Sequence, residues 1–233
     1  MEEAPEEPDP CLEQHNLTVA LIGQRLRREW QSKGAWRTFR FLFSRIVRCW
    51  RAVVYEADLE PPRLPSNWNP DETLQSFGPE EIDTVLTPAL RSFLGADGLE
   101  NLEGVRNGNR LFLVSAGSTL LHCGYILFRT RQTKLIGEMG EPPVIACCFT
   151  SPAARGRGLY RKALNAELCF LRESGYKRAV IETDPDNLPS RKGIEAAGFR
   201  LIRSVRAWIL LNWLVLQHSV EPPHGSGWRF FFL

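Results

Sequence analysis

One stretch of the sequence, residues 144–199, constrains the fold more than any other. It begins with an apolar run long enough for a buried strand, which leads into a loop rich in glycine and arginine. An amphipathic segment follows and ends at Ser174-Gly175, a common helix stop. A second apolar run, at 179–181, precedes a short helix that ends at Ala197-Gly198. This order of elements predicts parallel strands joined by helical crossovers.

The loop of this stretch is suited to binding a phosphate. Gly156 and Gly158 let the backbone approach an anion closely, and Arg155 and Arg157 add positive charge. The start of the following helix offers unpaired N–H groups and the positive end of a helix dipole. Neither a P-loop nor a dinucleotide-binding fingerprint matches, since the Lys-Ser or Lys-Thr pair of the first and the third glycine of the second are missing. The sequence therefore predicts a diphosphate cradle of another kind.

The loop and the residues after it resemble the GCN5-related N-acetyltransferase (GNAT) family. The acetyl-CoA loop of that family, R/Q-x-x-G-x-G/A, is matched from Arg155 to Leu159, whereas Tyr160 stands where the family has Gly or Ala. A second family pattern, N-x-x-[AS] followed by Gly-Phe, is matched by Asn187, Ser190 and Gly198-Phe199. The two motifs lie in register on the predicted elements, which makes the resemblance specific.

The resemblance implies an α/β (α+β) fold with a GNAT-like mixed, mostly antiparallel central sheet, flanked by helices and preceded by an N-terminal helical extension. We predict an acidic disordered tail (1–16), a basic amphipathic helical extension (17–50), a GNAT acetyltransferase domain (51–218) and a C-terminal tail (219–233). We expect strands at 51–59, 110–116, 119–129, 134–136, 144–149, 179–181, 200–204 and 206–217, and an early helix at 80–94 that is interrupted near Thr87-Pro88.

Composition narrows the location and the partners. A net charge of +2 argues against a nucleic-acid partner. The six cysteines form no C-x-x-C pair and lie mostly in apolar runs, so we predict buried free thiols, a reducing cytoplasm and no metal site. No apolar run approaches the ~18 residues that span a bilayer. We therefore expect a cytoplasmic protein.

A basic segment in the N-terminal extension leaves several readings open. Nine basic residues and one acid lie between Arg25 and Arg51, and apolar residues recur there at helical spacing. Such a helix can pack its apolar stripe on the domain, bind a protein or substrate, or contact an anionic membrane surface through residues 35–51. The last reading would make the protein peripheral to the membrane.

The resemblance also implies which residues hold the cofactor, acetyl-CoA or another acyl-CoA. In the family the strand before the loop splays from its neighbour and its backbone binds the pantetheine arm, while the loop amides hold the diphosphate. Carried onto this sequence, the cofactor-binding residues are Cys148, Phe149, Thr150, Arg155, Gly156, Arg157, Gly158, Leu159, Tyr160, Asn187 and Ser190.

Acyl transfer to an amine requires a general base. Glu182 is our first candidate, because it follows an apolar strand at the carboxyl end, where open α/β sheets bind their ligands. Glu138 and His122 are the second and third candidates. A solvated surface role remains the alternative for each, and a water molecule can also carry the amine proton.

The departing thiolate requires a proton donor. The family often has a tyrosine at the position of Ile194, so we assign Tyr160 as the catalytic substitute, provided that its side chain turns toward the sulfur. Cys147 and Cys148 suggest a nucleophile, but no histidine lies near them in the sequence, and thiols in buried strands are usually inert.

These observations predict a transferase, an acetyl-CoA-dependent N-acyltransferase that moves an acetyl (acyl) group to an amine acceptor by direct transfer. We expect a small-molecule or amino-sugar amine as the acceptor, and a homodimer is compatible with the sequence. The alternative is a non-catalytic acyl-CoA-binding or membrane-surface regulatory module on a GNAT fold.

Overall fold

A computed structural model describes residues 47–60, 67–85, 87–128, 131–138, 142–211, 213–221 and 225–233. Its contacts divide the chain into two units, residues 1–48 with 209–213 and residues 49–208 with 214–233. Most of the first unit lies outside the described residues, so the fold is that of the second. Within the described residues no helix is long and apolar enough to cross a membrane.

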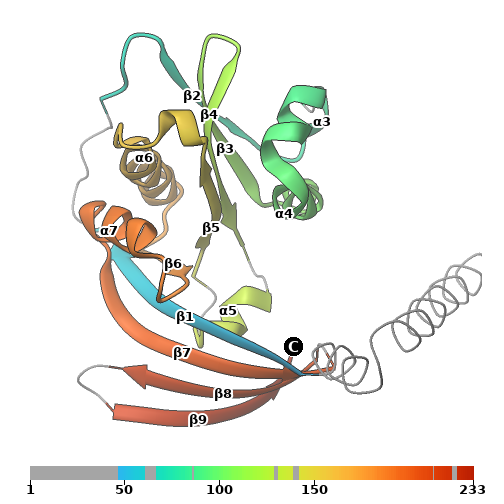
Figure 1. The fold of residues 1–233 in the computed structure, drawn as a ribbon, viewed down its shortest axis with the longest axis vertical. Helices are drawn as coiled ribbons and strands as arrows, with labels where there is room; N and C mark the ends of the chain where they lie inside the picture. Colours follow the sequence, from blue (N-terminus) through green and yellow to red (C-terminus); the bar gives the residue numbers. More distant parts are fainter. Residues whose placement is uncertain are drawn as a thin grey trace, which may run out of the picture. The chain divides into compact units, whose positions relative to one another are not determined.

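The strands form one nine-stranded sheet in the order β2-β3-β4-β5-β6-β1-β7-β8-β9 (Figure 1). They are β1 (Val47–Asp58), β2 (Glu72–Phe77), β3 (Arg110–Ala116), β4 (Thr119–Leu127), β5 (Val144–Thr150), β6 (Arg178–Thr183), β7 (Arg200–Leu210), β8 (Leu214–Glu221) and β9 (Gly225–Phe232). The helices are α3 (Ile82–Val85), α4 (Pro88–Arg106), α5 (Arg131–Leu135), the 3-10 helix η1 (Pro152–Ala154), α6 (Leu159–Glu173) and α7 (Leu188–Ala196). This mixed, mostly antiparallel sheet with flanking helices confirms the predicted fold class.

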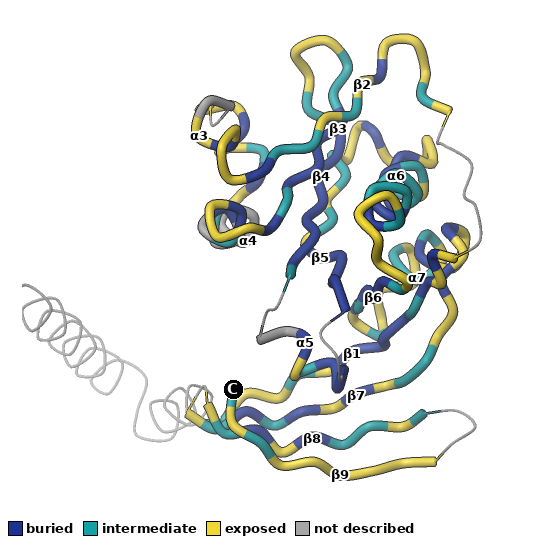
Figure 2. The backbone as a smooth tube through the Cα atoms, turned by 180° about the vertical axis from the view of Figure 1, so that it is seen from behind, coloured by how far each residue is buried: buried dark blue, intermediate teal, exposed yellow. Residues whose placement is uncertain are grey.

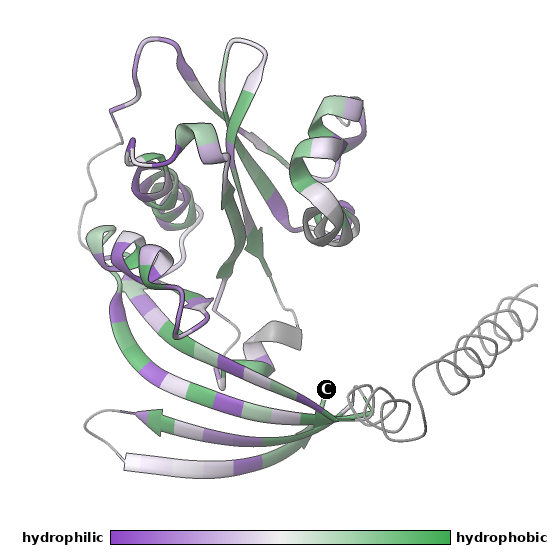
Figure 3. Cartoon of the chain, viewed as in Figure 1, coloured by the Kyte–Doolittle hydropathy of each residue, from purple (hydrophilic) through white to green (hydrophobic). Residues whose placement is uncertain are grey.

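Two apolar clusters cover the two faces of the sheet. One joins Leu90 and Leu94 of α4 to the sheet, and the other joins Leu164 and Leu168 of α6 and Ile194 of α7 to the opposite face. Accordingly, Figure 1 shows α3 and α4 on one side of the central strands and α6 on the other. The buried residues concentrate along β4 and the first half of β5, and these central strands are also strongly hydrophobic (Figures 2 and 3).

The strands β5 and β6 separate soon after they pair. Their parallel register holds only Val144 with Val180 and Ile145 with Ile181. Residues 146–150 of β5 therefore have no partner on β6 among the described pairs. On its other side β5 pairs with β4, and the register shifts there between Cys123 and Tyr125. The sheet thus opens at the end of β5 that leads into the glycine loop.

Several predicted elements are confirmed by the structure. The 110–129 hairpin is β3 and β4, with strand ends at 116 and 119, and the early helix is interrupted before Pro88. The amphipathic helix α6 ends at Glu173 and is capped by Ser174. The apolar runs that begin at 144 and 179 are the parallel neighbours β5 and β6.

One predicted strand is wrong. The segment expected as a strand at 134–136 lies in and just after the short helix α5. The side-chain amide of Gln217 donates to the carbonyl of Leu135, and the Arg203 guanidinium donates to the carbonyls of Ile136 and Gly137. These side chains from β7 and β8 satisfy the carbonyl groups at the end of the helix.

The break between the closing strands is also displaced. We expected it after Ser204, but β7 continues to Leu210 and the turn follows at Leu211, whose φ is 52°. Alternating burial continues through the expected break, since Val205 and Ala207 are both buried. The strand therefore follows its buried face past the polar residues that suggested an end.

Both ends of the predicted domain extend into segments that we assigned differently. Residues 225–232, placed in a C-terminal tail, form β9, which pairs with β8 from Leu214 with Phe232 to Glu221 with Gly225. Residues 47–50, placed in the helical extension, begin β1. The tail at 1–16 and most of the basic segment at 35–51 lie outside the described residues.

Candidate functional site

The loop between η1 and α6 contains two glycines in the left-handed region. The φ angle is 76° at Gly156 and 74° at Gly158, a conformation that costs other residues about 1–2 kcal/mol. Gly158 precedes α6 and provides no side-chain cap. The first bond within the helix runs from the Lys162 N–H to the Gly158 carbonyl, at 3.1 Å. The N–H groups that precede Lys162 are therefore directed out of the helix end, as anion binding requires.

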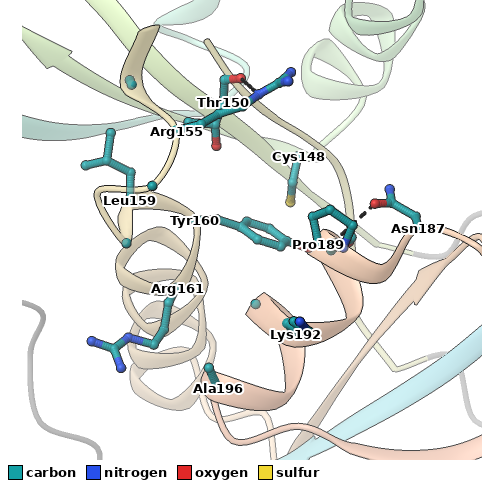
Figure 4. A pocket seen from close by; sticks show the side chains of 15 residues that line it. Cys148, Thr150, Arg155, Leu159, Tyr160, Arg161, Asn187, Pro189, Lys192 and Ala196 are labelled. Carbon is teal, nitrogen blue, oxygen red and sulfur yellow. Dashed lines mark hydrogen bonds between the residues drawn. The ribbon is translucent and has the colours of Figure 1, made fainter. Parts of the chain in front are cut away.

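A cavity of about 670 Å³ opens between this loop, the first turn of α6 and the helix α7 (Figure 4). Nine of the predicted cofactor-binding residues line it: Cys148, Thr150, Arg155, Gly156, Gly158, Leu159, Tyr160, Asn187 and Ser190. Ala154, Arg161, Pro189, Lys192, Gly193 and Ala196 complete the lining. The cavity thus joins a glycine loop, three cationic side chains and the separated end of β5.

Two predicted cofactor-binding residues do not line the cavity. Phe149 packs edge to face on Phe93 of α4, with 5.4 Å between the ring centroids. The Arg157 guanidinium donates to Glu72 of β2 at 2.8 Å, and Lys162 donates to the other oxygen of Glu72 at 3.1 Å. The charge of Arg157 is therefore paired with a carboxylate, and its side chain ties the glycine loop to β2.

Glu72 is the buried anchor of this loop. Its side chain has no exposed surface, and Asn69 also donates to it from the backbone and the side chain. Burial by itself raises the pKa of Glu72, but these hydrogen bonds and the Lys162 charge outweigh burial and bring the pKa below its usual 4.5. The carboxyl is therefore ionised at neutral pH.

Glu182, the predicted base, lies at the opening between the strands but not in the cavity. It follows Ile181, the last residue of β6 that pairs with β5, and it is partly buried. Because side chains alternate along a strand, Glu182 shares the face of Val180, which packs in the α4 cluster. The cavity lies on the other face, with α6. Any acceptor that reaches Glu182 would therefore approach from the α4 side.

The two alternative bases are held elsewhere. The Glu138 side chain is buried between Arg178 at 2.8 Å and Arg203 at 3.1 Å. His122 is fully buried, and its Nδ1 lies 2.7 Å from the Thr150 hydroxyl. Burial lowers the pKa of His122 to about 4, so the imidazole is neutral at pH 7.

Tyr160 connects the two helices of the cavity. Its hydroxyl lies 3.2 Å from the Ser190 hydroxyl, and its ring lies against Gly193 of α7, where a Cβ would come within 2.5 Å of it. The ring centroid is 5.9 Å from that of His122. Burial raises the pKa of Tyr160, so the phenol keeps its proton. Figure 4 shows the Tyr160 ring projecting from α6 toward Pro189, with Cys148 above it in that view.

Asn187 and Cys148 have defined local roles as well. The Asn187 side chain caps α7 by accepting the Ser190 N–H at 3.2 Å. Burial raises the pKa of Cys148 well above its usual 9.0, so this residue is a thiol and not a thiolate. A thiol in this state is a poor nucleophile.

Sequence reasoning missed Glu167, which points from α6 into the core beside this site. It is fully buried, although it is charged in its usual state. The helical periodicity contained the signal, because Glu167 lies four residues after buried Ala163 and three after buried Leu164. A carboxyl at this position of the apolar stripe has to enter the protein interior.

Comparisons with known proteins agree with this architecture. Residues 54–200, more than half of the chain, match the family model described as an acetyltransferase (GNAT) domain. No curated protein matches the sequence.

Solved structures include a Drosophila protein (13% identity, TM-score 0.50, 76% of this chain and 57% of that one). They also include a GCN5-related N-acetyltransferase from Sphaerobacter thermophilus (14% identity, TM-score 0.49, 82% of this chain and 58% of that one). A third is a GNAT acetyltransferase from Colwellia psychrerythraea (17% identity, TM-score 0.46, 66% of this chain and 53% of that one). The chain therefore spans little more than half the length of each, and at these identities the likeness concerns the fold alone. With its family model matched across the glycine loop and both flanking strands, the chain belongs to the GNAT acetyltransferase family.

Proposed function

We propose that the protein is an acetyl-CoA-dependent N-acyltransferase that moves an acetyl, or another acyl, group directly to an amine. One observation supports this most strongly. Strand β5, which separates from β6, leads to a left-handed glycine loop at the start of a 15-residue helix, and a cavity of about 670 Å³ adjoins both the end of β5 and the loop. That arrangement offers a groove for an extended arm and a cradle for its diphosphate.

The coenzyme would bind along this groove through main-chain groups. The N–H groups at 157–161 suit the diphosphate, and Arg155, Arg161 and Lys192 line the cavity as partners for further phosphate oxygens. The backbone of 148–150, which has no pairs with β6, suits the amide groups of the pantetheine arm. Asn187 and Ser190 would contact the same arm from α7.

The chemistry would take place at the opening between β5 and β6, which connects the two faces of the sheet. The acceptor nitrogen attacks the thioester carbonyl, with Glu182 accepting the amine proton, directly or through water. Tyr160, which keeps its proton, is the candidate donor to the departing sulfur. The cofactor would enter on the α6 face and the acceptor on the α4 face, where Phe149 and Phe93 lie.

We propose a small-molecule amine, an amino sugar included, as the acceptor. The exposed edge of Phe149, at 40% of its surface, provides an apolar contact on that face. A cytoplasmic location, a homodimer and an anionic membrane contact through residues 35–51 also remain proposals.

A second candidate function is a coenzyme-binding module without turnover. Tyr160 favours it, because its side chain fills the space between α6 and α7 at the position where the family pattern has Gly or Ala. In this reading the bound coenzyme would act as a regulatory ligand.

Thiol release over a panel of small amines and amino sugars tests the proposal. With acetyl-CoA at saturation, we expect at least one amine to release free CoA at a rate well above that of acetyl-CoA alone. Isothermal titration with CoA accompanies the assay. Binding without release over the whole panel would favour the regulatory module, and failure to bind CoA would contradict both.

A further inference from the structure

The Glu167 carboxyl is the least expected group in the interior. Its side chain is fully buried, and among the described residues neither oxygen has a hydrogen-bond partner. Buried polar atoms in native proteins nearly always have partners, because leaving one unpaired is costly. A carboxyl group kept in this state therefore needs an explanation.

Its position places it directly behind the cavity wall. A Cβ on Gly124 of β4 would overlap Glu167 Oε1 and would lie 3.3 Å from the Sγ of Cys148. Gly124 lies at the register shift between β4 and β5, so the carboxyl and the thiol meet at the same irregular point of the sheet. Cys148 in turn lines the cavity.

The same carboxyl is electrostatically coupled to the second donor in the wall. Glu167 and Tyr160 are seven residues apart on α6 and so share one face of the helix. When it is ionised, Glu167 raises the pKa of Cys148 and of Tyr160, although burial is the largest cause for both. Cys148 and Tyr160 are thus two pocket-lining donors with one carboxyl behind them.

Burial favours the protonated form of Glu167. Burial raises its pKa well above the usual 4.5, and no cation is paired with it among the described residues. The other titratable groups on this wall are neutral as well: burial lowers the pKa of His122 and raises that of Cys123. The wall therefore holds transferable protons and no fixed charge.

We propose that Glu167, Cys148 and Tyr160 form the proton-donating subsite for the sulfur of the coenzyme, with Glu167 as the store of the proton. The inference rests on the proposed acyltransferase function. It gives the chain a donor set in place of the tyrosine that the family often has at Ile194, which here is a buried apolar residue.

The proton inventory of the step is balanced. When the tetrahedral adduct collapses, the C–S bond breaks and its electron pair stays on sulfur. Cys148 or Tyr160 transfers its proton to that sulfur, and the Glu167 carboxyl replaces the proton just given. The resulting Glu167 carboxylate recovers a proton through Cys148 or Tyr160, which line the cavity, from water that received one from the amine when the C–N bond formed. Cys148 and Tyr160 contact the coenzyme, and Glu167 acts through them.

The test measures the ionisation of the bound thiol. Thiolate absorbance is followed over pH for complexes of CoA and of desulfo-CoA, which lacks the sulfur, and their difference removes the signal of the protein cysteines. As pH rises, Glu167 loses its proton near the thiol, and the resulting carboxylate opposes a second negative charge. We expect Glu167→Gln to lower the pKa of the bound thiol by about one unit.

Stability provides a second readout of the same variants. Glu167→Leu removes a buried unpaired carboxyl, so we expect its Tm to rise by about 2–6 °C. Leu171→Met, at another fully buried position of α6, is the control and should leave the pKa of the bound thiol unchanged.

The outcomes separate this inference from the proposed function. CoA that binds with the same thiol pKa in the wild type and in Glu167→Gln would overturn the proton store and leave the acyltransferase proposal standing. Failure of the wild type to bind CoA would overturn both. An equal shift in Leu171→Met would also contradict the inference, because repacking of α6 would then explain the effect.

Discussion

Replacing Glu72 by leucine should destabilise the fold by about 3 kcal/mol, because it leaves Arg157 and Lys162 without their buried carboxylate. The two cations are 40% and 21% exposed, so water recovers part of the loss and places the value at the lower end for a broken buried pair. Urea unfolding of both proteins at pH 7 measures the difference.

The pH dependence of stability provides a further check on Glu72. Its pKa in the folded chain lies below the usual 4.5, so its contribution is fully present above pH 4.5 and is lost as pH falls through the folded value. Glu72→Leu should lack this part of the acid slope. As a control, Asp83→Leu removes an exposed ion pair with Arg106 and should hardly move the urea midpoint. Equal losses in the two variants would contradict a special role for Glu72.

Gly158→Glu should weaken CoA binding about 100-fold or more. A Cβ at this position meets no atom within 4 Å, so the helix can form with a side chain there. The left-handed φ of 74° strains the new residue, and its carboxylate repels the diphosphate at short range. Isothermal titration with CoA measures the loss.

Gly175→Glu is the matched control for this variant. Gly175 also has a left-handed φ, 85°, and open space around its Cβ position, but it lies just beyond the other end of α6. The control therefore carries the same strain and the same charge, and it should bind CoA as the wild type does. Comparable weakening in both variants would show that helix stability, and not the loop, controls binding.

Local signals in the sequence were sufficient for the elements that hold the site. The glycines of the loop require positive φ, the apolar spacing of α6 fits its buried face, and both motifs lie within short stretches of the sequence. Each depends on neighbouring residues, which a sequence displays directly. The strand β5 and the helix α7 were predicted from the sequence for the same reason.

Elements fixed by distant partners could not be predicted in this way. The helix α5 ends on carbonyl groups that Arg203 and Gln217 satisfy from more than 60 residues away. We predicted Arg157 as a phosphate ligand, but its guanidinium donates to Glu72, which lies 85 residues away in the sequence. In both cases the residue that forms the interaction lies on a distant strand, and no local sequence pattern identifies that residue.

The residues at the inner wall of the cavity could be predicted only in part from the sequence. The periodicity of α6 contains a signal for the burial of Glu167 that we missed, and only the fold shows that this residue lies close to Gly124 and Cys148 at the register shift between β4 and β5. Likewise, Tyr160 was visible as a departure from the family loop, whereas its contacts with Ser190 and Gly193 depend on how α7 packs.

The central claim is that main-chain amides of the glycine loop bind the diphosphate of coenzyme A. Backbone amide NMR of the full chain, titrated with CoA and separately with pantetheine, which has no diphosphate, tests it most directly. The account predicts that CoA shifts the N–H signals of residues 156–161 strongly and that pantetheine leaves them in place. Shifts of equal size with both ligands, or none at these residues with saturating CoA, would contradict it.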